Sequence, residues 1–306
     1  MNNTIHQEMV KEAVKDKFRS SDTKDSAVVP RYPGSAEREY ERVSRSYMKL
    51  LNDSLKKHLP AIMSAVKHER TDSRYDSRLS FERKLRLEME EIAKELEQSV
   101  GKFGLDDYIE KIAKLMSKQT TREWKRTVKK TLGVDIFEDY YKGEAYEQAL
   151  KQWVSENVLK IKTIPQDTLG SLEKIILDGY QNGTSLRQMQ RDIQNEYNIS
   201  KRNAELLARD QVATLNASIT KMQQTDAGVK KYKWSTSKDS RVRDCHRELH
   251  GKIISWDDPP EMWYMTKKGK VYTGRHCNPG EDYACRCVAI PIFDVNTVDV
   301  PIKEGK

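Results

Sequence analysis

Cysteine and histidine side chains gather in one segment near the C-terminus of the chain. Between residues 245 and 287 lie all four cysteines and three of the six histidines, namely Cys245, Cys277, Cys285, Cys287, His246, His250 and His276. Thiolates and imidazoles together are the ligands that a zinc ion prefers. The segment therefore favours either a metal site or a set of buried thiols and backbone-bonded histidines that hold no ion.

One residue separates Cys285 from Cys287. Residues i and i+2 of a strand face the same side, so both thiols could converge on one ion. An upstream imidazole and a third thiolate would complete a closed tetrahedral site of the structural type. The predicted zinc ligands are therefore His246, Cys277, Cys285 and Cys287, with His276 and His250 as alternatives.

Patterns typical of catalysis are missing from the sequence. It contains no Gly-rich phosphate loop, no Gly-x-Ser-x-Gly elbow and no His-Glu-x-x-His helix. A metal-dependent nuclease that uses the histidines with Asn278 and Asp239 fits the spacing poorly. We therefore expect no enzymatic activity, with the nuclease as the alternative, and structural zinc as the one cofactor.

Positive charge concentrates between residues 111 and 130, where Glu123 is the only acidic residue. On a helix, most of these basic residues fall along one line. Such a stripe would attract nucleic-acid phosphates without sequence preference, although charge runs are more often solvated helix faces. The predicted DNA-binding residues are Lys111, Lys114, Lys118, Arg122, Lys125, Arg126 and Lys129.

Composition favours extended solvated helices over a large core. Charged residues make up 33% of the chain, against about 25% in a typical protein, and the net charge is +8. The N-terminus carries no apolar run typical of a signal peptide, and no stretch approaches the ~20 apolar residues of a membrane span. We therefore expect a reducing cytoplasm, no membrane association and no disulfide bonds.

Apolar spacing and chain breakers predict an α+β protein, with long helices followed by a small C-terminal domain that contains a short antiparallel sheet. Helix breaks are expected at Gly101–Asp107, Gly133–Val134 and Ile164–Pro165. The predicted regions are a flexible arm (1–35), a helical domain (36–162), a helical lead-in (163–228), the α+β domain (229–294) and a tail (295–306).

Local patterns also predict the elements inside the last three regions. Separate helices are expected to begin near Asp167, Ser185 and Ser200, and Gly228 should end the last of them. Strands are expected over 232–236, 252–256 and 286–292, with Pro291 ending the third. A short helix over 242–249 and a loop or hairpin over 259–280 complete the domain.

The C-terminal region contains a series of short motifs between Tyr232 and Cys287. They are Tyr232-Lys-Trp-Ser, Asp239-Ser-Arg-Val-Arg-Asp-Cys-His246, Leu249-His-Gly251-Lys, Trp256-Asp-Asp-Pro-Pro260, and Pro279-Gly-Glu-Asp282 leading into Cys285-Arg-Cys287. Together with the helix that carries Arg209 and Asn216, they resemble the C-terminal domain of the Mu F-like phage head morphogenesis proteins over residues 160–292. One departure is that His276 is followed by Cys277 and Asn278, whereas the family often has His directly before Pro-Gly.

The resemblance implies a minor head, or minor capsid, protein of a tailed bacteriophage, located in the virion after assembly in the bacterial cytoplasm. The implied partners are the portal protein, the major capsid or scaffolding proteins, and double-stranded DNA. A DNA-binding or toxin-delivery protein built on the same domain is an alternative, and the short tail argues against a cargo domain. The residues that match structural positions of the family are Asp239, Arg241, Arg243, Gly251, Pro279, Gly280, Arg209 and Asn216. The last two share a helix face and are expected to dock their helix onto the C-terminal domain.

Overall fold

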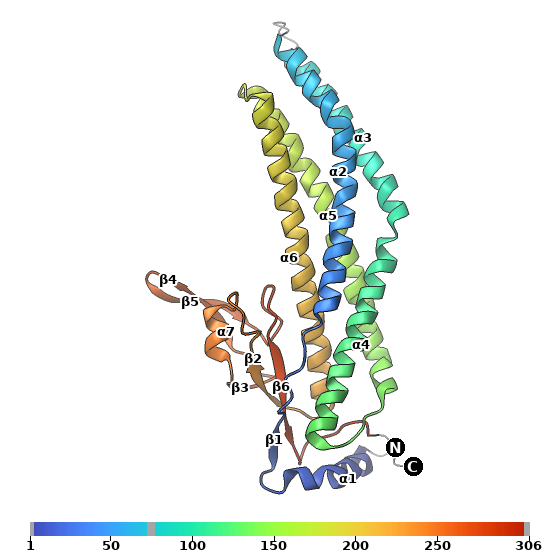
Figure 1. The fold of residues 1–306 in the computed structure, drawn as a ribbon, viewed down its shortest axis with the longest axis vertical. Helices are drawn as coiled ribbons and strands as arrows, with labels where there is room; N and C mark the ends of the chain where they lie inside the picture. The colour runs from blue at the N-terminus through green and yellow to red at the C-terminus, as the bar shows by residue number, and fades with distance from the viewer. Residues whose placement is uncertain (1–2, 72–76, 303–306) are drawn as a thin grey trace. The chain divides into compact units, whose positions relative to one another are not determined.

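The computed structural model describes residues 3–71 and 77–302, and its elements are drawn in Figure 1. The helices are α1 (Asn3–Val14), η1 (Lys15–Phe18), α2 (Gly34–Thr71), α3 (Ser77–Phe103), α4 (Leu105–Leu132), η2 (Glu138–Lys142), α5 (Glu144–Gln181), α6 (Leu186–Asp226) and α7 (Asp244–Leu249). The strands are β1 (Thr23–Asp25), β2 (Lys231–Ser235), β3 (Ile253–Ser255), β4 (Glu261–Thr266), β5 (Gly269–His276) and β6 (Val288–Asp294). These elements confirm the predicted α+β class.

The chain forms two compact units, and each is discontinuous in sequence. The sheet unit contains Met1–Glu37, Ile112–Trp153 and Arg209–Lys306, and the helical unit contains Arg38–Lys111 and Val154–Ala208. This division differs from the predicted consecutive regions. Four of the helices, α2, α4, α5 and α6, contribute residues to both units, which a reading along the chain does not reveal.

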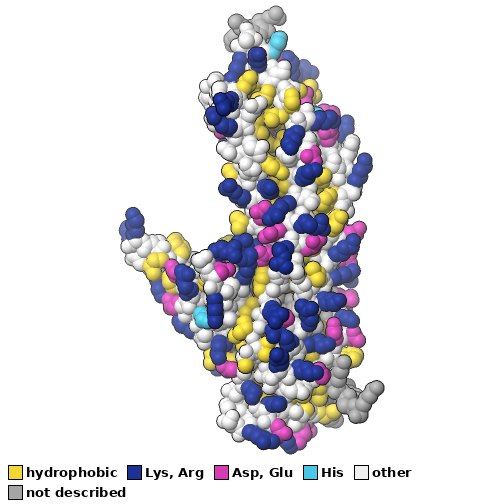
Figure 2. Space-filling model, viewed as in Figure 1, with side chains coloured by type: hydrophobic (Ala, Val, Ile, Leu, Met, Phe, Trp, Pro, Cys, Tyr) yellow, Lys and Arg dark blue, Asp and Glu magenta, His cyan; other side chains and the backbone are white. Residues whose placement is uncertain are grey.

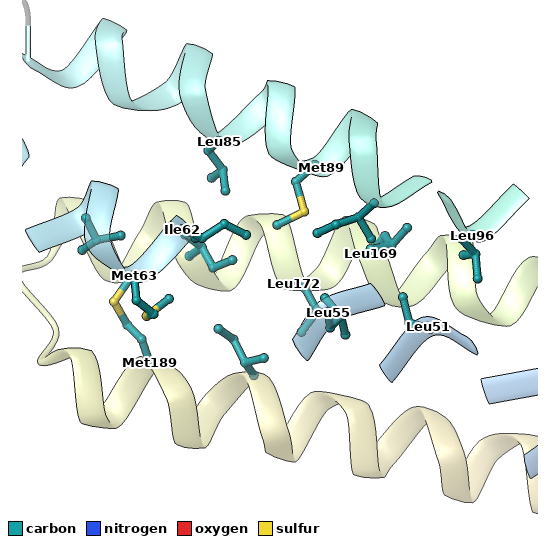
Figure 3. Packing of buried hydrophobic residues seen from close by; sticks show 14 of the residues in the cluster. Leu51, Leu55, Ile62, Met63, Leu85, Met89, Leu96, Leu169, Leu172 and Met189 are labelled. Atoms are coloured by element: carbon teal, nitrogen blue, oxygen red, sulfur yellow. The ribbon is translucent and has the colours of Figure 1, made fainter. Parts of the chain in front are cut away.

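The helical unit has one apolar core between segments of α2, α3, α5 and α6. The side chains that fill it recur at helical spacing, so each segment turns one stripe inward. Figure 3 shows these stripes pointing toward one another. The labelled core residues are Leu51, Leu55, Ile62, Met63, Leu85, Met89, Leu96, Leu169, Leu172 and Met189.

Two of the three predicted helix breaks are confirmed, whereas the break at Ile164–Pro165 and the helix starts near Asp167 and Ser200 are wrong. Gly104 and Gly133, both with positive φ, follow the ends of α3 and α4. In contrast, α5 runs through Pro165 and α6 runs through Ser200. A proline inside a helix costs about 3 kcal/mol, but apolar side chains on both sides of it are buried, and their burial outweighs that cost.

The main sheet of the sheet unit has the strand order β1-β6-β2-β3, and all its pairs are antiparallel. The predicted strands correspond to β2, β3 and β6. The third continues past Pro291, which pairs with Tyr232 and accepts the Ser26 N–H with its carbonyl. A second sheet, β4-β5, is a hairpin in the segment predicted as loop or hairpin.

The N-terminal segment predicted as a flexible arm contains α1, η1 and β1, and β1 pairs with β6 through Lys24 and Phe293. Val10, Val14 and Phe18 are buried in a core shared with Phe293. Apolar side chains four residues apart lie on one face of a helix. Charged residues between them make this helical pattern hard to detect in the sequence. The predicted tail is also packed, with Val298 and Val300 in that same core.

None of the described helices contains a stretch long and apolar enough to cross a membrane.

Candidate functional site

Three of the four predicted zinc ligands meet in the sheet unit. His246 comes from the short helix α7, and Cys285 and Cys287 come from the loop that leads into β6. The sulfur of Cys285 lies 3.6 Å from His246 Nδ1, and that of Cys287 lies 3.7 Å from the same nitrogen. All three side chains are buried, and their donor atoms lie within 4.8 Å of one another. We call these three residues the His–Cys cluster.

Cys277 does not belong to the His–Cys cluster, so the predicted closed set of four ligands does not form. It is buried in the same apolar core as Cys285 and Cys287, but its sulfur is not among the grouped donor atoms, and its backbone N–H bonds to the Pro260 carbonyl at the base of the β4-β5 hairpin. The alternative ligands are engaged elsewhere. His250 Nδ1 accepts the Thr236 N–H at 3.2 Å, and His276 Nδ1 lies 2.9 Å from the Pro259 carbonyl.

The second nitrogen of His246 faces Asp282, a buried carboxylate. Nε2 lies 3.2 Å from Asp282 Oδ2, close enough for an ion pair but outside hydrogen-bond alignment. Arg243 and Arg275 contact the same carboxylate at 3.3 and 2.8 Å. Burial would raise the pKa of Asp282, but His246 and the two guanidinium groups lower it to about 2. Asp282 therefore stays ionised behind the imidazole.

The groups of the His–Cys cluster shift one another's ionisation. Burial would lower the pKa of His246, but Asp282 and Cys285 outweigh it and raise that pKa to about 9. A hydrogen bond with Cys287 holds the pKa of Cys285 well below the ordinary thiol value, against the effect of burial. The same hydrogen bond, together with burial, raises the pKa of Cys287.

A cavity of about 40 Å³ adjoins the His–Cys cluster, and all three cluster residues line it. Arg209, Arg241 and Arg286 contribute to its walls. The volume exceeds the ~15 Å³ that one ordered water needs. A small ligand or water therefore has room beside the cluster.

The family-like motif residues around the cluster mainly shape the backbone. Asp239 accepts the N–H of Arg241 at 2.9 Å, and Arg243 donates to the Tyr283 carbonyl at 2.6 Å. Gly280, which follows Pro279, has a φ of +92° and packs against α6, where an added Cβ would lie 3.1 Å from a backbone oxygen. Gly251, with φ +82°, leads from α7 into β3.

Arg209 and Asn216, which were expected to dock their helix onto the C-terminal domain, have different partners. Arg209 contacts Glu37 at 3.4 Å, shares that carboxylate with Arg286, and lines the cavity beside the cluster. Asn216 accepts the Thr120 hydroxyl of α4 at 3.0 Å. Asp210 on α6 fixes the loop that carries Cys285 and Cys287, because its carboxylate accepts the N–H of Ala284 at 2.8 Å. Ala284 has φ +47°, and its strained backbone explains why the loop needs this fixed acceptor. Its adjacency to Arg209 was the only sequence signal for it.

The predicted basic stripe lies on α4, and at least three of its seven cations form ion pairs. Lys125, Arg126 and Lys129 form ion pairs with Glu138, Glu123 and Asp135. A carboxylate therefore lies beside each of these three cations. Lys111 packs over the Tyr108 ring, and Lys114 is exposed.

Lys118 and Arg122 are two exposed cations of the stripe. Among the residues that the structure describes, no acidic side chain lies within ion-pair distance of either. They are four positions apart and therefore neighbours on the helix surface. Figure 2 shows one face of the molecule, on which Lys and Arg are interspersed with Asp and Glu.

Comparison with known proteins finds a family match for the C-terminal part of the chain. Residues 171–290 match the family model described as phage Mu protein F like protein, which confirms the resemblance carried by the motifs. An uncharacterized protein of Haemophilus influenzae is 28% identical over 178 residues, which is 58% of this chain but 37% of that relative. No solved structure matches the chain significantly. The matched segment contains the His–Cys cluster and excludes α4.

Proposed function

Residues 171–290 belong to the phage Mu protein F-like family, and on that basis we propose that the chain acts in phage head morphogenesis. The role is that of a minor head protein which docks on the portal or procapsid and remains in the virion. The family match is the observation that carries this proposal. No catalytic step is included, because binding alone accounts for the role.

The packing of the sheet unit supports a docking role. The Mu F-like strands β2, β3 and β6 are joined by β1 from the N-terminus, and residues after β6 fill the core beneath them. Segments from both parts of the sequence thus stabilise one rigid element. A rigid element loses little conformational entropy on binding, which favours association with a large assembly.

We assign non-specific DNA contact to α4, with Lys118 and Arg122 as its main residues. Each neutralised phosphate releases counterions, so such contacts produce affinity that falls steeply with salt. Lys114 extends the same line of the helix by one turn toward its N-terminus. The paired cations Lys125 and Lys129 contribute less, because a phosphate must compete with an existing carboxylate.

The head role is tested in particles made by the phage or prophage that encodes the chain. Purified heads should contain the protein at a few copies each, measured by quantitative mass spectrometry against the major capsid protein. Loss of the gene should reduce the yield of DNA-filled heads. Absence of the protein from both procapsids and mature heads would contradict the proposal.

DNA contact is tested by fluorescence anisotropy with a sequence-random duplex over a range of salt concentrations. The double reversal Lys118→Glu/Arg122→Glu should reduce the slope of log affinity against log salt by about 2. Lys201→Glu/Arg202→Glu on α6 makes the same charge change and serves as the control. Equal losses in both variants would mean that only net charge matters, and cleaved DNA on a gel would overturn the binding-only role.

A further inference from the structure

We propose that the His–Cys cluster binds one zinc ion through three protein ligands, with its fourth coordination position facing the adjoining cavity. This site differs from a closed site of four protein ligands, since Cys277 takes no part. It does not depend on the proposed role in head assembly.

The spacing of the donor atoms fits a tetrahedral zinc site. Zn–S bonds of about 2.3 Å and Zn–N bonds of about 2.0–2.1 Å at tetrahedral angles place the sulfur and nitrogen about 3.6 Å apart. The observed separations from His246 Nδ1 are 3.6 Å to Cys285 and 3.7 Å to Cys287. A ring nitrogen has one lone pair, so two sulfurs converging on it at equal distance fit a shared ion better than two hydrogen bonds.

The surroundings of His246 present the correct nitrogen to the ion. Histidine ligands of zinc commonly direct their other ring nitrogen at a carboxylate, which fixes the tautomer. Asp282 lies 3.2 Å from Nε2, leaving the Nδ1 lone pair directed at the sulfurs. Arg243 and Arg275 anchor both carboxylate oxygens, so the orienting group is itself held in place.

Charge and ligand type select the ion. Two thiolates and a neutral imidazole around a divalent cation are neutral overall, which suits a site in which each ligand is at most 3% exposed. Arg243 and Arg275 are both paired with the Asp282 carboxylate rather than with the thiolates. Thiolates favour zinc over magnesium or calcium, which prefer oxygen ligands.

The cavity defines the fourth position. It is lined by all three cluster residues and has room for a water molecule or small anion. Zinc sites with three protein ligands keep an exchangeable position of this kind. The ion would also tie α7 to the loop that leads into β6, and the ligands in these two segments are 39 or more residues apart along the chain.

The experiment uses the full chain, expressed in cells grown in zinc-containing medium and purified with any affinity tag removed. Metal analysis should give about one zinc per chain. Replacement by cobalt should produce thiolate-to-cobalt charge-transfer bands and the visible bands of tetrahedral cobalt. A wild-type chain that contains no metal and shows neither band would overturn the proposal.

Single substitutions identify the ligands. Cys285→Ser, Cys287→Ser and His246→Ala should each lose zinc and alter the cobalt bands. Cys277→Ser and Cys245→Ser are matched controls, because both thiols are buried nearby yet outside the cluster, and both variants should retain one zinc. Loss of zinc in Cys277→Ser with a native circular dichroism spectrum would overturn the three-ligand site.

Variants that fail to fold do not decide the matter, so a second measurement uses wild-type protein. A strong chelator should remove the zinc, and titrated cobalt should then restore the bands with a one-to-one endpoint. A chelated chain that takes up no cobalt, or that binds cobalt without a thiolate charge-transfer band, would contradict ligation by Cys285 and Cys287.

Discussion

Glu37, near the start of α2, accepts hydrogen bonds from Arg286, the residue that separates the two cysteines of the His–Cys cluster. The Arg286 Nε to Glu37 Oε2 distance is 3.0 Å, and Arg209 contacts the same carboxylate. Glu37 is 4% exposed, so its charge depends on these two guanidinium groups. The contact ties the N-terminal part of the sheet unit to the loop that carries both thiols.

Glu37→Gln should lower the free energy of unfolding by about 2 kcal/mol near neutral pH, because it removes the charge that pairs with both guanidinium groups. Burial would raise the pKa of Glu37, but Arg286, Tyr32 and Arg209 lower it below the ordinary value of 4.5. A lowered folded pKa means that the stabilisation is complete above pH 4.5 and is lost as pH falls through the folded value. Urea unfolding of both proteins from neutral to acidic pH measures this difference, which should shrink in acid. A constant difference would show that the Glu37 charge is not responsible.

Asp282→Asn should weaken zinc binding about 10- to 100-fold while leaving all three ligands in place, because it removes the charged acceptor behind His246. Chelator competition measures the affinity. Asp239→Asn is the control, since Asp239 lines the cavity but contacts Arg241 rather than the histidine. Unchanged zinc affinity in Asp282→Asn would show that the Asp282 carboxylate does not contribute to zinc binding.

Gly228→Ala should lower the unfolding free energy by more than about 2 kcal/mol, since the residue has a left-handed backbone. Its φ is +71°, and an added Cβ would lie 1.7 Å from the carbonyl oxygen of Thr297. Gly170→Ala in α5 is the matched control, because nothing lies within 4 Å of its added Cβ, and it should be neutral or stabilise by up to ~1 kcal/mol. Thermal unfolding compares the two, and equal effects would rule out the backbone clash.

Leu85→Ala should lower the unfolding free energy of the helical unit by about 2–5 kcal/mol through the cavity left in its core. Leu87 lies two positions away on α3 and is 55% exposed, whereas Leu85 is 2% exposed. Leu87→Ala should therefore change stability by less than ~0.5 kcal/mol. Denaturant titration followed by circular dichroism measures both, and similar losses would contradict the assigned helix face.

The elements that depend on local preference could be predicted from the sequence. Gly104 and Gly133 end helices because glycine adopts positive φ without steric cost, and the strand at Tyr232 and the helix at His246 follow from local patterns. The order of short motifs also indicates the resemblance to the Mu F-like family that the match over residues 171–290 bears out. Each of these signals is contained within a few neighbouring residues.

The tertiary structure alone decided what depends on residues distant in the sequence. Whether α5 continues through Pro165 depends on core burial on both sides of it, and whether Lys24 pairs with Phe293 depends on a strand at the other end of the chain. Spacing alone allowed Cys277 as a ligand and gave no role to Asp282. Their places are set by the base of the β4-β5 hairpin and by the charges around His246. The physical reason is that burial and electrostatic pairing act between neighbours in space, whereas a sequence pattern records only neighbours along the chain.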